Sequence, residues 1–316
     1  MKKTAGISVI LFLLLIPMLF HADYVTEGAR HGLLLWYNSV VPALFPFMVL
    51  SGLIVSGGGI PLIMAPFYKI LHPLFGISEN GCYVLISGLL CGCPMGAKTC
   101  ADFVNEGRIS LAEGKFLLAI CNHPSPMFIL GYMYSFFAHE FEIWELLICV
   151  YLPVILLAIL AKIIYFSKPE ESVFGRTDNQ SQATGCLSID NTILSAVEIL
   201  CKIGGYLVLF SILIIFIKNT PQIPTPVRIF TTGLLEMTTG IRELTESLNS
   251  EHAWIFSIAA LTFGGFSGIF QTNAVLSPHT SDNEKKAGLS IRPYFLWKLA
   301  HAVCSAGLAY FICIKR

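Results

Sequence analysis

Long stretches of this chain contain no aspartate, glutamate, lysine or arginine. Such stretches cover residues 31–68, 81–97, 116–138 and 252–281. An α-helix needs about 20 apolar residues to cross the roughly 30 Å hydrocarbon core of a bilayer, and most of these runs provide that length. Only 13% of all residues are charged, about half the share that is typical of a soluble domain. The sequence therefore predicts an all-α polytopic membrane protein embedded in a lipid bilayer.

Composition and motifs exclude several functional classes. The formal net charge is zero, which gives no support to a nucleic-acid partner. Cys91 and Cys93 have no further ligands nearby to complete a metal site, and the ten cysteines are interpreted as small buried side chains. No nucleophile elbow, HExxH or phosphate-binding loop occurs. We therefore expect no enzyme activity, no metal and no cofactor.

The most informative segment is residues 87–98, SGLLCGCPMGAK. It is apolar like a membrane helix, yet it contains three glycines and Pro94, which interrupt helices. Broken backbone at membrane depth is tolerated only where protein buries it or where it lines a wet cavity. A helix that restarts after Pro94 would direct unpaired N–H groups into the break, and these favour an anion. Lys98 would add a full positive charge; the alternative is a kinked helix whose lysine reaches the interface.

Two further segments combine helix breaks with polar side chains. In residues 121–126, CNHPSP, two prolines interrupt an apolar run, although a plain turn between two helices is the alternative. In residues 263–273, FGGFSGIFQTN, Ser267 and Gln271 are four apart and share a helix face. The alternative there is a helix-packing seam of small residues. Together the three segments give the candidate substrate-binding residues Cys91, Gly92, Pro94, Gly96, Lys98, Asn122, His123, Ser125, Ser267, Gly268, Gln271 and Asn273.

The chain divides into two membrane halves. A polar linker at 167–191 separates an N-terminal half (1–166), formed by a leading helix and a first repeat, from a C-terminal half (192–316) that forms a second repeat. The pattern G-x-x-C-G at 88–92 is echoed by G-x-x-S-G at 264–268, as expected for a transporter with paired broken or re-entrant helices. Roughly eight to ten membrane segments are expected, at residues 5–20, 33–57, 79–92, 110–122, 124–138, 143–166, 192–217, 226–248, 253–270 and 289–314. The first is interpreted as an uncleaved helix rather than a signal peptide.

Three ordered motifs are similar to a known family. The segments SGLLCGCPMGAKTCADFVNEGRIS, LAICNHPSPMFILG and FGGFSGIFQ resemble the YlbJ-type sporulation integral membrane proteins, within the nucleoside-recognition, or Gate, membrane family. The resemblance extends from about residue 35 to the C-terminus, without the linker. Cys91 and Cys93 stand where the family pattern has a hydroxyl and an aromatic residue.

The resemblance implies transport of dipicolinic acid from the mother cell towards the forespore, across the outer forespore membrane of an endospore-forming bacterium. This substrate is a small anionic ring with two carboxylates, which suits the helix ends and Lys98. Two alternatives stay open: transport of nucleosides or related metabolites, and a sporulation membrane protein that transports nothing. Association into a homo-oligomer or with other sporulation membrane proteins also stays open.

Overall fold

The computed structural model describes residue 12 and residues 15–166, 189–276 and 288–316, and in these parts the regular secondary structure is entirely helical. The first expected helix (5–20) and the linker lie largely outside the described residues. The α-helices are α2 (Ala22–Leu35), α3 (Val41–Ser56), α4 (Ile60–Phe75), α5 (Glu79–Cys91), α6 (Met95–Asn105), α7 (Leu111–Ile120), α8 (Pro126–Phe128), α9 (Ile143–Phe166), α10 (Ile189–Lys218), α11 (Thr225–Leu235), α12 (Met237–Ser247), α13 (Ser250–Phe263), α14 (Gly265–Leu276) and α15 (Ile291–Lys315). Short π-helical and 3₁₀ turns join α2 to α3 and follow α8.

Within the described residues, four helical segments are long and apolar enough to cross a membrane. They are α9, α10, the α13–α14 unit and α15. Two bent pairs, α2 with α3 and α4 with α5, raise the number to six if each pair counts as one span. The all-helical membrane class is thus confirmed, whereas the expected eight to ten segments and the two repeats are not.

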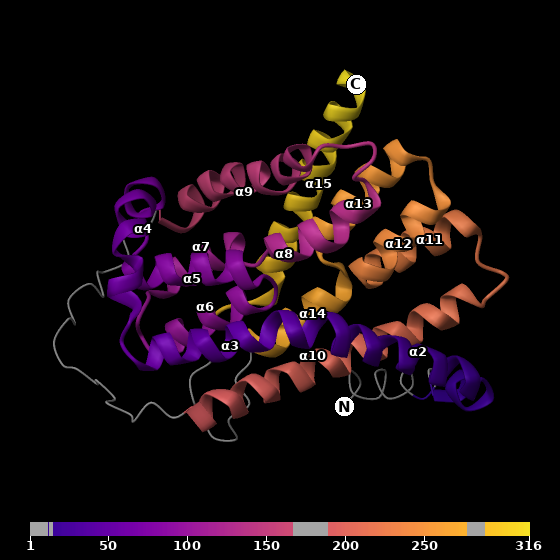
Figure 1. Ribbon diagram of the computed structural model, residues 1–316, viewed down its shortest axis with the longest axis horizontal. Helices are drawn as coiled ribbons and strands as arrows, with labels where there is room; N and C mark the ends of the chain where they lie inside the picture. Colours follow the sequence, from indigo (N-terminus) through magenta and orange to yellow (C-terminus); the bar gives the residue numbers. More distant parts are fainter. Residues whose placement is uncertain (1–11, 13–14, 167–188, 277–287) are drawn as a thin grey trace, which may run out of the picture.

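Three long helices agree closely with the expected ranges. The predictions 143–166, 192–217 and 289–314 correspond to α9, α10 and α15. Each is a long apolar run that stays helical through isolated helix breakers, Pro153 in α9 and Gly204–Gly205 in α10, so the length of the run is sufficient to define it. In Figure 1, α10 runs beside α2 and α3 along one side of the molecule, while α15 passes through its centre.

Other expected helices are divided, and each division has a local cause. The predicted helix 226–248 ends at Leu235 and restarts at Met237, because Glu236 takes an extended conformation and caps α12. The predicted helix 253–270 is interrupted at Gly264 and Gly265, both with positive φ (83° and 68°). The helix expected at 33–57 begins earlier, at Ala22, and contains a π-helical turn before Val41.

The proposed register of the internal echo is wrong. It aligns Gly92 with Gly268, but Gly92 is the C-cap that follows α5 whereas Gly268 lies inside α14. The corresponding break in the second half is four residues earlier, at Gly264. Both halves do contain a helix–break–helix unit, α5–α6 and α13–α14. Duplication of the whole half stays a prediction.

Two glycines let α2 and α10 pack closely. A β-carbon added to Gly28 would lie 2.5 Å from the Ile212 Cα, and one added to Gly32 would lie 2.7 Å from the Val208 Cα. Gly28 and Gly32 are four apart and face α10 from one side of α2, as in the small-xxx-small contacts of membrane helices. This contact holds α2, in the N-terminal half, against α10, in the C-terminal half.

Candidate functional site

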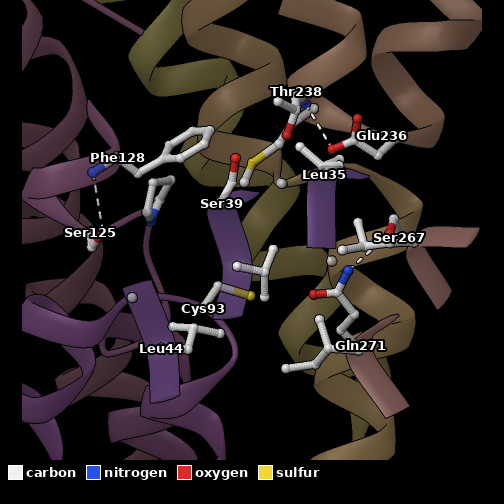
Figure 2. A pocket seen from close by; sticks show the side chains of 18 of the residues that line it. Leu35, Ser39, Leu44, Cys93, Ser125, Phe128, Glu236, Thr238, Ser267 and Gln271 are labelled. Carbon is white, nitrogen blue, oxygen red and sulfur yellow. Dashed lines mark hydrogen bonds between the residues drawn. The ribbon is translucent and has the colours of Figure 1, made fainter. Parts of the chain in front are cut away.

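A cavity lies where the broken helices meet. Its lining comes from both halves of the chain, and Figure 2 shows side chains from α2, α3, α8 and α14 around it. The Cys93 and Gln271 side chains project towards the space between these elements (Figure 2). The lining residues are Leu35, Ser39, Val40, Leu44, Cys91, Gly92, Cys93, Pro124, Ser125, Phe128, Ile203, Leu207, Glu236, Met237, Thr238, Phe263, Gly264, Ser267, Gly268, Gln271, Tyr294 and Lys298.

Half of the predicted site residues line this cavity and half do not. Those in the lining are Cys91, Gly92, Ser125, Ser267, Gly268 and Gln271. The others, Pro94, Gly96, Lys98, Asn122, His123 and Asn273, lie elsewhere. Asn273 is exposed on α14, whereas its neighbour Thr272 is fully buried, because one residue along a helix turns the side chain by about 100°.

The break after α5 does not leave the open anion site that the sequence suggested. The helix α6 restarts at Met95, as expected, but each of its first four N–H groups has an acceptor. The Met95 and Gly96 N–H groups donate to the Gly92 carbonyl (2.9 and 3.4 Å), and Lys98 N–H donates to the Pro94 carbonyl (3.0 Å). Ala97 N–H donates to Asn122 Oδ1 (3.4 Å). The α6 N-terminus is therefore occupied by protein groups.

Lys98 is likewise engaged away from the cavity. Its ammonium forms an ion pair with Asp102, one turn along α6, at 2.5 Å. The two side chains are 23% and 41% exposed, so the pair is neutralised and partly solvated. The spacing of four residues favours this pairing on any helix. Lys98 therefore offers no free positive charge to the cavity.

Gly88 and Gly96 serve a packing role at the crossing of three segments. A β-carbon on Gly88 would lie 2.0 Å from the Cys121 carbonyl oxygen, and one on Gly96 would lie 2.2 Å from the same atom. The backbone at Cys121, at the start of the break at residues 121–126, is thus held between α5 and α6. Glycine is required here because no side chain has room.

Asn122 joins the three broken segments through its side-chain amide. It is 1% exposed, and its amide Nδ2 donates to Tyr294 OH (2.7 Å) and to Thr272 Oγ1 (3.0 Å). The same nitrogen lies 3.4 Å from Cys93 Sγ. Buried amides of this kind fix geometry, because leaving one of these groups unpaired costs about 1–3 kcal/mol. Asn122 therefore positions the cavity wall and does not itself line it.

The positive charge at the cavity comes from Lys298, which the sequence reasoning missed. This lysine is 3% exposed and lines the cavity from α15. Its ammonium donates to the Asn122 carbonyl at 3.4 Å, and no carboxylate of the described residues lies within 4.0 Å of it. A lone lysine within the predicted 289–314 helix was a usable signal, since ionisable residues inside membrane helices are functional candidates.

A buried carboxylate, Glu236, also lines the cavity. Glu236 is 3% exposed and lies at the α11–α12 break. Its two oxygens accept from the N–H groups of Thr238 (2.8 Å) and Thr239 (2.7 Å). The positive end of α12 thereby stabilises its negative charge. The hydrogen bonds of Glu236 are thus directed to the start of α12, and it forms no ion pair with Lys298.

Comparison with known proteins identifies one similar membrane protein. The sporulation integral membrane protein YlbJ of Bacillus subtilis (strain 168) is 26% identical in an alignment of 322 positions, which covers 90% of this chain and 77% of that protein. No family model matches the chain, so membership of the Gate family is not confirmed. No solved structure matches it either.

Proposed function

Because this chain belongs with the YlbJ-type sporulation integral membrane proteins, we propose that it transports a small anionic solute, dipicolinate, from the mother cell towards the forespore. The outer forespore membrane is the location that fits this role. The observation that carries the proposal is Lys298, a buried ammonium that faces a cavity and has no ionic partner in the part of the chain that the structure describes. An unpaired charge in this setting is costly. A carboxylate bound in the cavity would compensate it.

The rest of the lining suits a planar dicarboxylate. Ser267 and Gln271 offer a hydroxyl and an amide, joined by a hydrogen bond of 2.9 Å (Figure 2). Phe128 and Phe263 provide apolar ring faces on other sides of the cavity. Mostly apolar walls with a few convergent polar groups are typical of small-molecule sites. Binding and release involve no covalent chemistry, so the proposal requires no catalytic residue.

A second cavity supports a route through the protein. It lies between α7, the end of α9 and the start of α15, and Lys115, Tyr165 and Trp297 are among its lining residues. Tyr294 lines both cavities, and its hydroxyl is held by Asn122 and Thr272 (2.7 and 3.4 Å). We propose that displacement of Tyr294 joins the two cavities during transport, while the helices on either side rearrange.

The experiment that tests the proposal measures dipicolinate movement directly. Purified protein in liposomes preloaded with dipicolinate should exchange it for labelled external dipicolinate. Unlabelled nucleosides should not compete, because they lack the carboxylate that Lys298 would pair with. Empty liposomes, and protein with Tyr294 replaced by tryptophan to obstruct the passage between the two cavities, serve as controls. Competition by nucleosides would favour the alternative substrate class, and absence of any exchange would contradict the transport proposal.

A further inference from the structure

Two buried histidines lie directly behind the cavity lysine. His123 in the α7–α8 connection is 4% exposed, and His301 on α15 is 1% exposed. Their rings meet edge to face, with centroids 4.7 Å apart and planes at 75°. Neither histidine lines the cavity, so substrate contact does not account for them. Lys298 and His301 are three apart, which places them on one face of α15.

The hydrogen bonds of this pair are incomplete. His301 Nε2 lies 2.8 Å from the Val150 carbonyl of α9, and because a carbonyl only accepts, this nitrogen carries the hydrogen. His301 Nδ1 is then a free acceptor, with no hydrogen-bond partner among the described residues. The ring nitrogens of His123 are also buried, and within the same part of the chain neither makes a hydrogen bond of good geometry, although the Ile120 backbone interacts with the ring. Buried polar groups are nearly always paired, so these imidazole nitrogens are available to take up a proton or to bind a small non-protein group.

The surrounding charges limit what these nitrogens can bind. His123 interacts electrostatically with His301 and Lys298, and His301 interacts with Lys298. Two other ionisable groups lie nearby. The Tyr151 hydroxyl of α9 donates to the Pro124 carbonyl at 3.4 Å. Cys93 interacts electrostatically with Lys298. The described residues hold no cluster of three metal-binding side chains. The histidines alone are too few for a closed metal site, whereas a proton needs only one free nitrogen.

We propose that the His123–His301 pair binds a proton together with the anion at Lys298, so that the solute moves with protons. This inference rests on the proposed anion site. With the cavity empty, burial disfavours a charged imidazole at either position, and the nearby Lys298 ammonium adds to that cost. A carboxylate on Lys298 neutralises that charge, and a proton from the aqueous side can then bind His301 Nδ1 or the free nitrogen of His123. Linkage is reciprocal, so the bound proton strengthens anion binding, and both leave when the cavity opens to the other side.

The test measures the protons taken up when dipicolinate binds. Calorimetric titrations of the full-length protein at about pH 7.5, where dipicolinate is fully ionised, are repeated in buffers with different ionisation enthalpies. The wild type should take up about one proton per dipicolinate, and its dissociation constant should rise up to about tenfold per pH unit above the pH where the pair titrates. The variants His123→Gln and His301→Gln should still bind dipicolinate, with proton uptake lost and a nearly flat pH dependence. His252→Gln, at an exposed position on α13, is the matched control and should behave like the wild type.

The outcomes separate this inference from the transport proposal. Dipicolinate binding without proton uptake by the wild type would overturn proton coupling and leave the anion site intact. Unchanged proton uptake in both glutamine variants would also overturn it, because another group would then hold the proton. Absence of dipicolinate binding at any pH would overturn the anion site and the coupling with it. In liposomes at zero membrane potential, a gradient of one pH unit should drive about tenfold accumulation by the wild type and none by His301→Gln.

Discussion

Replacement of Lys298 by methionine should weaken dipicolinate binding and stabilise the empty protein. Methionine keeps the length and apolar stem of lysine but removes the ammonium. A carboxylate about 4 Å from this ammonium, at an effective dielectric constant of about 20, is stabilised by about 4 kcal/mol. Truncation of one member of a buried charge pair typically costs about 2–5 kcal/mol. Since 1.4 kcal/mol is tenfold, the dissociation constant should rise about 30- to 4,000-fold.

The stability of the empty protein should change in the opposite direction. Lys298 is 3% exposed and lacks an ionic partner among the described residues, and an apolar side chain of similar volume removes the cost of burying that charge. A gain of about 1 kcal/mol corresponds to a rise in Tm of about 2–4 °C in a protein of this size class. A merely structural lysine would lose stability and binding together. The opposite signs are therefore the specific signature of a ligand-binding charge.

The assay combines calorimetric titration with thermal unfolding in detergent, and the matched control is Lys98→Met. Lys98 lies in a partly solvated pair with Asp102, so its loss should change stability by about 1 kcal/mol or less and leave dipicolinate affinity near the wild-type value. This comparison also tests the expectation from sequence that Lys98 is the anion-binding lysine. If Lys298→Met binds dipicolinate within about threefold of the wild type, or if Lys98→Met shows the large loss of affinity, the electrostatic assignment is wrong.

Three further predictions concern packing and helix ends. Gly88→Ala should lower Tm strongly, because its methyl group would lie 2.0 Å from the Cys121 carbonyl oxygen. Gly131→Ala is the control and should leave Tm unchanged, because a β-carbon there has no neighbour within 4 Å. Equal Tm values for the two variants would contradict the packing role of Gly88. Gly28→Val should separate α2 from α10 and expose new cleavage sites to limited proteolysis, and an unchanged proteolytic pattern would refute this. Glu236→Ala should cost about 0.5–2 kcal/mol by removing the α12 cap, measured as denaturant stability; a stability at or above that of the wild type would show that the cap contributes nothing.

The sequence by itself determined the membrane class and the long uninterrupted helices. A bilayer offers no hydrogen bonds to free backbone groups, so an apolar run that is long enough to cross it forms an α-helix. For this reason α9, α10 and α15 could be predicted from the sequence. The glycine and proline clusters also located the three breaks, and the helix restart after Pro94 was correctly placed. Serine caps at Ser78 and Ser110 begin α5 and α7 close to where the apolar pattern starts. All of these features depend on neighbours along the chain.

Tertiary structure alone decided which polar groups face the cavity. A helix N-terminus after Pro94 looked open in sequence, but Asn122, distant along the chain, fills it. Lys98 looked available until Asp102 paired with it. Lys298 became the candidate anion-binding lysine because packing buries it and places no carboxylate of the described residues within 4.0 Å of it. Whether a charge is paired, solvated or free is a property of its neighbours in space, so the same residue type can be a surface ion at one break and the proposed anion-binding group at another.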